Sequence, residues 1–452
     1  MFIPPTTVQE ITWPALPSPT AASMLAIQHQ LEQSQWATEG ELLNQQFEQL
    51  KVVVNYANKH VPYYKNLFKS ANIKITDSLF NLENWKTIPI ITRQDIQTAG
   101  KDLYSTQIPR EHGKIGEIST SGSTGRTVKV AGTSITNFFW NAFTLRDHYW
   151  HQRDLLNKVA TIKYLPKSLS KTISIDGWGP ATDMVYKTGK MAGMSIKTSI
   201  SEQVDWLAKE DPEYLLIYPS SIKAIANYAQ QFNTQFKSLK EITTIGETLT
   251  PKTREFLKDV FGVPVHDIYS CQEVGYLALQ CPKHEHYHIQ SENVFLEILD
   301  DNNQPCKPGQ VGRVVITSLH NFATPLIRYD IGDYAEVGES CDCGRGLPVI
   351  KRIMGRVRNL VTYPDGTKKW PIVGSDSYDN IAAIKQFQFI QKTVNDIDVK
   401  LVVKQPLSEE QELKLKVCMQ EALNHTFNLN FSYHEDIPRS EGGKFEDFIS
   451  EI

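Results

Sequence analysis

The chain has 452 residues, which is enough for a large core and a second domain. Its formal net charge is -4 and 40% of its residues are hydrophobic, so the composition is that of a globular protein without a basic surface for nucleic acid. No apolar run reaches the length of a membrane span, and the proline-rich start lacks the pattern of a secretion signal. We therefore expect a cytoplasmic protein with no membrane or nucleic-acid partner.

Helices are expected first along the chain. Residues 1–19 predict an extended arm, and residues 21–68 mix polar Gln and Glu with Leu, Ala and Val in a pattern typical of helices. From about 118 to 250 the pattern predicts strands alternating with helices. Short apolar runs predict buried strands at residues 214–220, 241–250 and 262–270.

The pattern changes to a period of two after residue 293. Residues 293–300 and 312–319 alternate in this way, and the segment DNNQPCKPGQ between them is rich in turn residues. Two alternating strands joined by such a segment predict a β-hairpin.

The sequence pattern changes again near Gly355, where we expect a domain boundary. The segments QFQFIQKT, IDVKLVV and FNLNFSY predict strands, and Ser408 with Gln411 forms a capping-box pattern for a helix that runs to about Thr426. Strand, strand, helix and strand in this length predict a small α+β domain. We therefore expect an α/β protein with a large N-terminal domain of mixed sheets at 1–354, of which 1–68 is mostly arm and helices, and a small domain at 355–452.

A loop rich in glycine and hydroxyl side chains, STSGSTGRTVKV, begins at Ser119. Backbone N–H groups and hydroxyls in such a loop bind phosphate, glycine allows close approach, and Arg126 would add a forked cation. The Gly-Lys-Ser/Thr ending of a Walker loop is absent. The alternative interpretation is a solvated linker.

Cysteine and histidine gather in two segments that flank the predicted hairpin. CPKHEHYHI begins at Cys281, and CDCG supplies Cys341 and Cys343. Three cysteines and a histidine suit tetrahedral zinc, and four protein ligands make such a site structural. We favour His288 as the histidine, with His284 and His286 as alternatives. The competing interpretation is a polar loop with ordinary thiols.

Seven segments in this order resemble the signatures of adenylate-forming ligases, and most closely the phenylacetate–CoA ligase branch. They are HVPYYKNLF with IPIITRQDI, TSGSTG, TIGETLT, IYSCQEVG, IRYDIGDYAEV, IMGRVRNLV and PRSEGGKFEDF. The resemblance implies a large AMP-binding domain and a small mobile C-terminal domain joined by a hinge.

The resemblance also implies residue roles in binding ATP. The loop residues that would bind the β- and γ-phosphates are Thr120, Ser121, Gly122, Ser123, Thr124 and Gly125. The residues that would border the adenine and ribose are Gly246, Glu247, Tyr269, Ser270, Tyr329, Asp333 and Arg356. The family often has Gly-Lys-Pro where this chain has Gly125, Arg126 and Thr127.

Three further roles follow from the same resemblance. Glu273 would hold Mg²⁺, and Lys444 would be the catalytic lysine between the substrate carboxylate and the α-phosphate. Arg358 stands where the family has the Asp or Lys of the hinge pivot, and we expect it to be exposed. Cys271 and Gln272 depart from the family pattern beside Glu273.

The implied reaction joins a carboxylic acid to a thiol at the expense of ATP. The acid attacks the α-phosphate, pyrophosphate leaves, and a thiol then displaces AMP from the acyl-adenylate. Coenzyme A is the expected thiol, and the phosphopantetheine arm of a carrier protein is the alternative. A non-catalytic nucleotide-binding relative is the alternative from another class, and a homodimer is among the expected assemblies.

The acid itself is not readable from the sequence. Its pocket is expected near residues 178–190, 218–221 and 246–248, and DGWGPATDMVYKTG departs from the pattern expected for phenylacetate. Asp183 would face either a substrate amine or water. Aryl, fatty and amino acids all remain as candidates.

Overall fold

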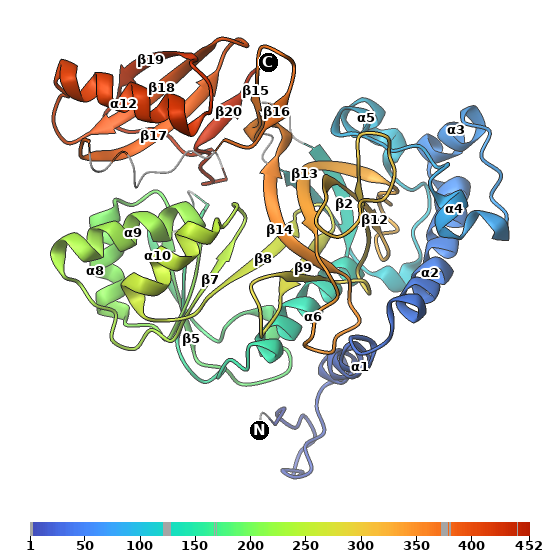
Figure 1. Ribbon diagram of the computed structural model, residues 1–452. Helices are drawn as coiled ribbons and strands as arrows, with labels where there is room; N and C mark the ends of the chain where they lie inside the picture. Colours follow the sequence, from blue (N-terminus) through green and yellow to red (C-terminus); the bar gives the residue numbers. More distant parts are fainter. Residues whose placement is uncertain are drawn as a thin grey trace. The chain divides into compact units, whose positions relative to one another are not determined.

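The computed structural model describes residues 3–120, 128–166, 168, 170–371, 378, 381–440 and 442–452. The chain divides into two compact units, Met1–Ile353 and Met354–Ile452, here called the N-terminal and C-terminal units (Figure 1). Each is described by itself.

The N-terminal unit begins with three helices, α1 (Pro19–Ser34), α2 (Glu39–His60) and α3 (Pro62–Ser70). Thr38 and Glu41 form a capping box at the start of α2, which fixes where that helix begins. One face of α2 is buried in the main core of the unit, through Leu50, Val54 and their neighbours. The predicted helical region is therefore confirmed, with breaks before Glu39 and Pro62.

A twelve-stranded mixed sheet forms the centre of the N-terminal unit, in the order β11-β12-β13-β14-β10-β9-β8-β7-β6-β3-β5-β4. Its parallel half consists of β3 (Val159–Lys163), β5 (Lys190–Ser195), β6 (Tyr214–Ile217), β7 (Glu241–Ile245) and β8 (Val265–Cys271), with β4 (Thr172–Asp176) antiparallel at the edge. The other half consists of β9 (Gly275–Gln280), β10 (Tyr287–Ile289), β11 (Val294–Leu299), β12 (Val311–Ser318), β13 (Tyr329–Val337) and β14 (Val349–Arg356). The predicted buried strands and the predicted hairpin, which is β11 with β12, are confirmed.

Helices cover both faces of the parallel half. On one face lie α8 (Ile200–Glu210), α9 (Pro219–Phe232) and α10 (Pro251–Phe261), side by side in Figure 1. They bury the apolar side chains of β3 and β6, including Ile162 and Ile217. On the other face α6 (Ser134–Trp150) packs on Ile245 and Ile268. Two-sided burial explains why these strands read as continuous apolar runs.

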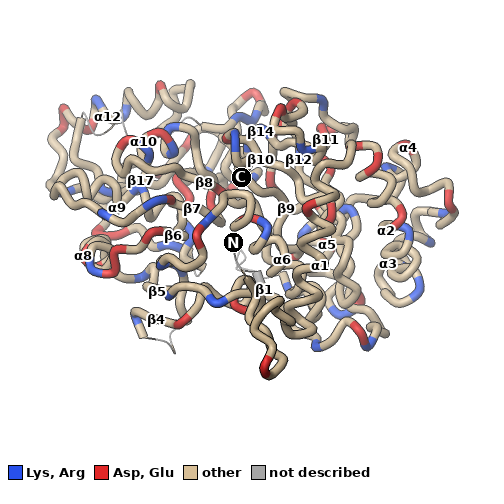
Figure 2. Tube along the Cα trace, turned by 90° about the horizontal axis from the view of Figure 1, so that it is seen from below, with Lys and Arg blue, Asp and Glu red and all other residues tan. Residues whose placement is uncertain are grey.

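The remaining elements of this unit are short. They include α4 (Leu82–Trp85), α5 (Arg93–Ala99), α7 (Pro180–Asp183) and a separate hairpin of β1 (Ile115–Thr120) with β2 (Val128–Thr133). Basic and acidic residues are interspersed along the chain (Figure 2), as the small net charge leads one to expect. None of the described helices combines the length and the apolar character needed to cross a bilayer.

The described part of the C-terminal unit contains a four-stranded sheet and the helix α12 (Glu409–Ala422). Its strands are β17 (Ile384–Gln391), β18 (Asp396–Val403), β19 (Asn428–Tyr433) and β20 (Phe448–Ser450), in the order β19-β18-β17-β20, and β15 (Val361–Thr362) pairs separately with β16 (Lys368–Lys369). The capping box of Ser408 and Gln411 opens α12 (Glu409–Ala422), as predicted. The helix ends before Thr426 because Asn424 takes a left-handed conformation with φ 53°.

Candidate active site

The parallel strands β6, β7 and β8 end side by side. Ile217 is in register with Thr244, and Ile245 with Ile268, so the segments that follow these strands meet at one edge of the sheet. In open α/β sheets, ligands bind in the crevice outside the carboxyl ends of the strands. The predicted nucleotide residues Glu247 and Glu273 stand directly after β7 and β8.

A hydrogen bond joins two of the predicted ribose and adenine residues. The hydroxyl of Tyr269 donates to Oδ2 of Asp333 over 2.9 Å, although the two residues lie on β8 and β13, far apart in the sequence. Tyr269 is buried, so the bond is shielded from water and holds one oxygen of the carboxylate. The other oxygen keeps acceptor capacity for hydroxyl groups of a ligand.

The pKa of Cys271 reflects the negative charge of the carboxylates near it. Burial raises the pKa of its thiol well above the usual value, and the carboxylates of Glu273 and Asp333 raise it further. Both carboxylates therefore act on the same buried thiol. Two carboxylates close together repel each other, and a bound cation would relieve that repulsion.

Glu247 has a partner at the start of α9. The backbone N–H of Ser220 donates to its Oε2 over 2.9 Å, which puts a carboxylate at the N-terminus of that helix. Such a placement stabilises the helix through its unpaired N–H groups and its dipole. Gly246, at φ 83°, supplies the left-handed turn that brings Glu247 there.

The predicted phosphate loop lies largely outside the described residues. This holds for Ser121, Gly122, Ser123, Thr124 and Gly125, and for the side chain of Thr120. The strands on either side of it are described, with Thr120 opposite Val128. Val128 is fully buried in the same cluster as Tyr269, so the root of the hairpin packs on the core that carries the candidate site.

Three predicted residues belong to the C-terminal unit. Arg356 ends β14, and Lys444 closes a turn in which the N–H of Ser440 donates to the carbonyl of Lys444 and the N–H of Lys444 donates to the hydroxyl of Ser440. Arg358 was expected to be exposed, and this is wrong: the side chain is half-buried and forms an ion pair with Glu446 of the same unit. The ion pair holds the guanidinium against Glu446 where an exposed pivot was expected.

The structure shows that the carboxylate of Asp183 is held by its own loop. Its carboxylate accepts hydrogen bonds from the N–H groups of Trp178 and Gly179, at 3.1 and 2.8 Å, and from the hydroxyl of Thr188 at 2.6 Å. The carboxylate thus closes its own loop, and its residue is exposed, in keeping with the expected contact with water.

Cysteine and histidine side chains meet beside β10. The ligand atoms of Cys281, His286, His288 and Cys341 lie within 4.8 Å of one another. The two sulfurs of Cys281 and Cys341 are 3.8 Å apart, too far for a disulfide and close to the edge of a tetrahedron with metal–sulfur bonds of about 2.3 Å. The ring Nε2 of His286 is buried and has no hydrogen-bond partner among the described residues.

Neighbouring groups orient these side chains. Nδ1 of His288 lies 3.2 Å from the carbonyl of Leu347, which leaves Nε2 as the ligand atom. That Nε2 is 3.4 Å from Sγ of Cys343. His284 instead lies 2.5 Å from a carboxylate oxygen of Asp342. Three residues of the predicted set, Cys281, His288 and Cys341, are thus brought together with His286, and the fourth, Cys343, contacts His288.

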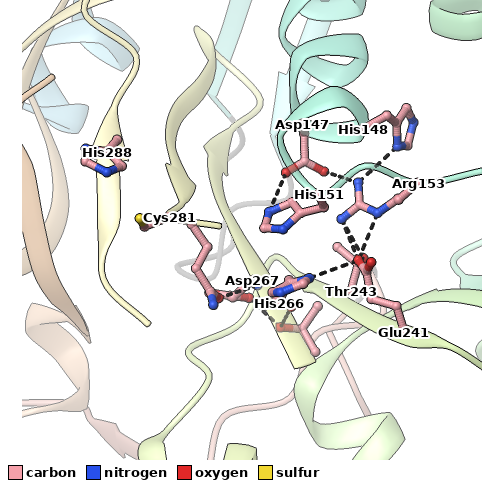
Figure 3. A network of polar contacts seen from close by, with 12 residues as sticks. Asp147, His148, His151, Arg153, Glu241, Thr243, His266, Asp267, Cys281 and His288 are labelled. Atoms are coloured by element: carbon pink, nitrogen blue, oxygen red, sulfur yellow. Dashed lines mark hydrogen bonds and ion pairs between the residues drawn. The ribbon is translucent and has the colours of Figure 1, made fainter. Parts of the chain in front are cut away.

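A buried network of charges, not anticipated from the sequence, occupies the opposite edge of the sheet (Figure 3). Arg153 pairs with Asp147 at 2.5 Å and with Glu241 at 2.6 Å. His148 and His151, from the last turn of α6 and just beyond it, contact the same pairs, and burial lowers their pKa to about 3 and about 4. Because Glu241 opens β7, this network lies at the amino ends of the strands and stabilises the fold away from the candidate site.

Two open hollows of about 490 Å³ each lie elsewhere in the N-terminal unit. The first is lined by Arg313 and Arg328, which already pair with Asp330 and Glu297. Neither hollow includes a predicted site residue.

The comparisons with known proteins point to AMP-binding enzymes and coenzyme A ligases as similar proteins. The family model for AMP-binding enzymes matches residues 117–324, and the CapK C-terminal domain model matches residues 364–451. A solved 2-hydroxyisobutyryl-CoA ligase in the postadenylation state is similar in fold, with a TM-score of 0.71, 16% identity, and coverage of 93% of this chain and 92% of that one.

Two curated relatives extend over most of the chain. Protein CapK of Staphylococcus aureus is 24% identical over 91% of this chain and 89% of the relative. Phenylacetate-coenzyme A ligase of Thermus thermophilus is 23% identical over 88% and 94%. The chain is thus similar over most of its length to phenylacetate-coenzyme A ligases, and the predicted resemblance and fold class are confirmed.

Proposed function

We propose that the protein is an AMP-forming acid–thiol ligase that activates a carboxylic acid as an acyl-adenylate and passes the acyl group to coenzyme A. The observation that carries the proposal is the grouping of Tyr269, Asp333 and Glu273 around Cys271, at the edge of the sheet where ligands bind. The named relatives that are coenzyme A ligases support the same reaction.

Asp333 would hold the ribose of ATP. Tyr269 fixes one carboxylate oxygen, and the other can accept from the ribose hydroxyls. Glu273 is buried and stands where a hard cation would be held. Mg²⁺, when bound, neutralises charge on the phosphates as pyrophosphate separates.

Lys444 would act at the reacting centre in one arrangement of the chain. An ammonium group beside the α-phosphate stabilises the charge that builds up when the carboxylate attacks. Arg356 would reach the ribose, and the segment around Arg358 would serve as the hinge between the half-reactions. The residues of the loop 120–125 would hold the β- and γ-phosphates through N–H and hydroxyl groups.

The acceptor is coenzyme A in this proposal, and a carrier protein is the alternative. Both present the same thiol, so the chemistry of the second step is shared. A cytoplasmic location, where both ATP and coenzyme A are supplied, belongs to the proposal, and a homodimer stays a prediction.

The proposal includes a structural zinc ion. Cys281, His288, Cys341 and Cys343 would hold it, because their sulfur and Nε2 atoms approach at distances suited to tetrahedral ligands. His286 competes with Cys343 for the fourth place, since its buried Nε2 lies in the same cluster. Four protein ligands leave no open position, so the ion would support the β9–β10 hairpin and take no part in the reaction.

Pyrophosphate release tests the proposed reaction. The protein, ATP and Mg²⁺ are incubated with a panel of carboxylic acids, and at least one acid is expected to release pyrophosphate. Free coenzyme A should then accelerate AMP release, whereas a loaded carrier protein should do so if the alternative holds. Bound ATP with no release for any acid would favour the non-catalytic relative.

A further inference from the structure

Lys163 lies at the point of the sheet where the strand order reverses. It is the last residue of β3, which lies between β5 and β6 in the parallel half. The chain leaves β3 toward β5 on one side and returns to β6 on the other, so β3 stands at the point where the strand order reverses. Crevices at such points are where open α/β sheets bind their ligands.

The side chain of Lys163 belongs to the face of β3 away from α8 and α9. Ile162 is buried against those helices, and side chains alternate along a strand, so Thr161 and Lys163 point to the other face. Lys163 follows Ile162, Ile162 is in register with Ile217, and Ile217 with Thr244. Lys163 is therefore in the same row across the sheet as Ile245, which Gly246 of the candidate site follows.

This lysine has no partner within the described part of the chain. Its side chain is half-buried, and no hydrogen bond or ion pair reaches its ammonium group there. Burial alone lowers its pKa, to about 8, so the amine still carries a proton at neutral pH. On the same face, the hydroxyl of Thr161 is buried and is likewise unpartnered among the described residues.

Among the described residues of the N-terminal unit, the buried arginines have acidic partners. Arg146 contacts Glu292, Arg153 contacts Asp147 and Glu241, and Arg328 contacts Glu297. A buried charge is costly unless it is paired, and this chain follows that rule elsewhere. The neighbours of Lys163 do not supply an anion, because residues 163–171 contain three lysines and no acidic residue.

We infer that Lys163 binds a second carboxylate of the substrate, and that the acid activated by this protein is a dicarboxylic acid. The inference rests on the proposed function. Two strand spacings, about 10 Å, separate β3 from β7, and a short diacid together with the lysine side chain covers that span. One carboxylate then reacts with ATP while the other pairs with the ammonium group, and the neighbouring hydroxyl of Thr161 donates to it.

The test compares acids of equal carbon number with and without the second carboxylate. Succinate is paired with butyrate, glutarate with valerate and terephthalate with toluate in an ATP–pyrophosphate exchange assay. For at least one pair the wild type should favour the diacid, and Lys163→Met should lower the ratio of the two kcat/KM values by roughly a hundredfold, the size of a lost charged hydrogen bond. Lys163→Arg should retain most of the ratio. Lys197→Met is the matched control, because Lys197 is a nearby lysine that packs over Tyr164.

An unchanged ratio in Lys163→Met, or a wild type that favours the monoacid of every pair, would overturn the inference while leaving the proposed function intact. If no acid of the panel supports exchange, the result would count against the proposed function instead.

Thermal unfolding then still tests the site, because a diacid should raise the Tm of the wild type and not that of Lys163→Met. Equal shifts in both proteins would overturn the inference. Without ligand, Lys163→Met should unfold a few degrees higher than wild type, since an unpaired buried charge is removed.

Discussion

At the scale of single residues, the candidate site depends on the contact between Tyr269 and Asp333. Their hydrogen bond of 2.9 Å crosses from β8 to β13 and fixes one oxygen of the carboxylate. The roles of both residues in nucleotide binding rest on this geometry and stay predictions until they are measured.

Asp333→Ala should weaken nucleotide binding. The variant removes the acceptor for the ribose hydroxyls, and each lost hydrogen bond to a charged group is worth about 1.5–3 kcal/mol. We expect ATP with Mg²⁺ to raise the Tm of wild type clearly and that of the variant far less. Asp301→Ala, at an exposed position, is the control. Equal shifts in the two variants would refute the ribose role.

Some residues of the site could be predicted from the sequence and others could not. Glu273 and Asp333 stand in local motifs, so a short stretch of sequence was enough to single them out. Lys163 ends an ordinary apolar strand and looks like any solvent-facing lysine; only the structure reveals that it is half-buried and unpaired. The partners of Asp183 were not predictable, because the N–H groups of Trp178 and Gly179 are brought to its carboxylate by backbone conformation.

At the scale of elements, the strands were predictable where both faces are buried. The run YLLI in β6 is continuous and apolar because helices cover both faces of the sheet there, and β7 is likewise buried almost throughout. Strands of three residues, such as β10 and β20, have too few positions for a pattern. The buried network was not predictable either, since Arg153 and Glu241 are far apart in the sequence and meet only through the sheet.

The β9–β10 hairpin should depend on zinc. Purified protein is expected to contain about one zinc ion per chain, and Cys281→Ser should release it and lower the Tm by several degrees. Cys306→Ser, a half-buried cysteine outside the cluster, is the control. Comparing the zinc content of Cys343→Ser with that of His286→Gln identifies the fourth ligand. Freshly prepared, chelator-free wild type without metal would rule out the site.

The buried network predicts a loss of stability in acid. Burial lowers the pKa of His148 to about 3 and of His151 to about 4, whereas the unfolded chain takes up these protons near pH 6.5. The contribution is therefore complete above pH 6.5 and is lost as the pH falls from 6.5 toward 4. Burial raises the pKa of Asp147, but the charges of Arg153 and His151 outweigh that effect and lower it, which extends the loss to lower pH.

Chemical denaturation across this pH range measures the effect. The free energy of unfolding should fall by a few kcal/mol between pH 6.5 and 4. His151→Gln should flatten that fall, and His29→Gln, at an exposed position, should leave it unchanged. A variant with the wild-type slope would show that the histidines do not cause it.

At the scale of the whole molecule, the reaction needs both units. Asp333 and Glu273 belong to the N-terminal unit, and Lys444 belongs to the C-terminal unit. The superfamily resemblance assigns Lys444 to the first half-reaction only. A substitution at this residue should therefore slow adenylate formation and leave thioester formation unchanged.

Lys444→Ala should reduce adenylate formation by roughly a hundredfold or more, because it removes a charge that stabilises the transition state. Thioester formation from a synthetic acyl-adenylate should stay near the wild-type rate. Arg358→Pro should do the reverse, since it stiffens the expected hinge and removes the ion pair with Glu446. Arg358→Ala is the control that removes the ion pair alone. Equal damage to both half-reactions in Lys444→Ala would contradict the two-step assignment.

The most direct test of the central claim follows an oxygen atom. An acid that supports pyrophosphate release is labelled with heavy oxygen in its reacting carboxylate and incubated with the protein, ATP, Mg²⁺ and coenzyme A. If an acyl-adenylate forms, one labelled oxygen stays on the phosphate when the thiol displaces it, and mass spectrometry finds the label in AMP and not in pyrophosphate. Label in inorganic phosphate together with ADP, or AMP that carries none, would contradict the account.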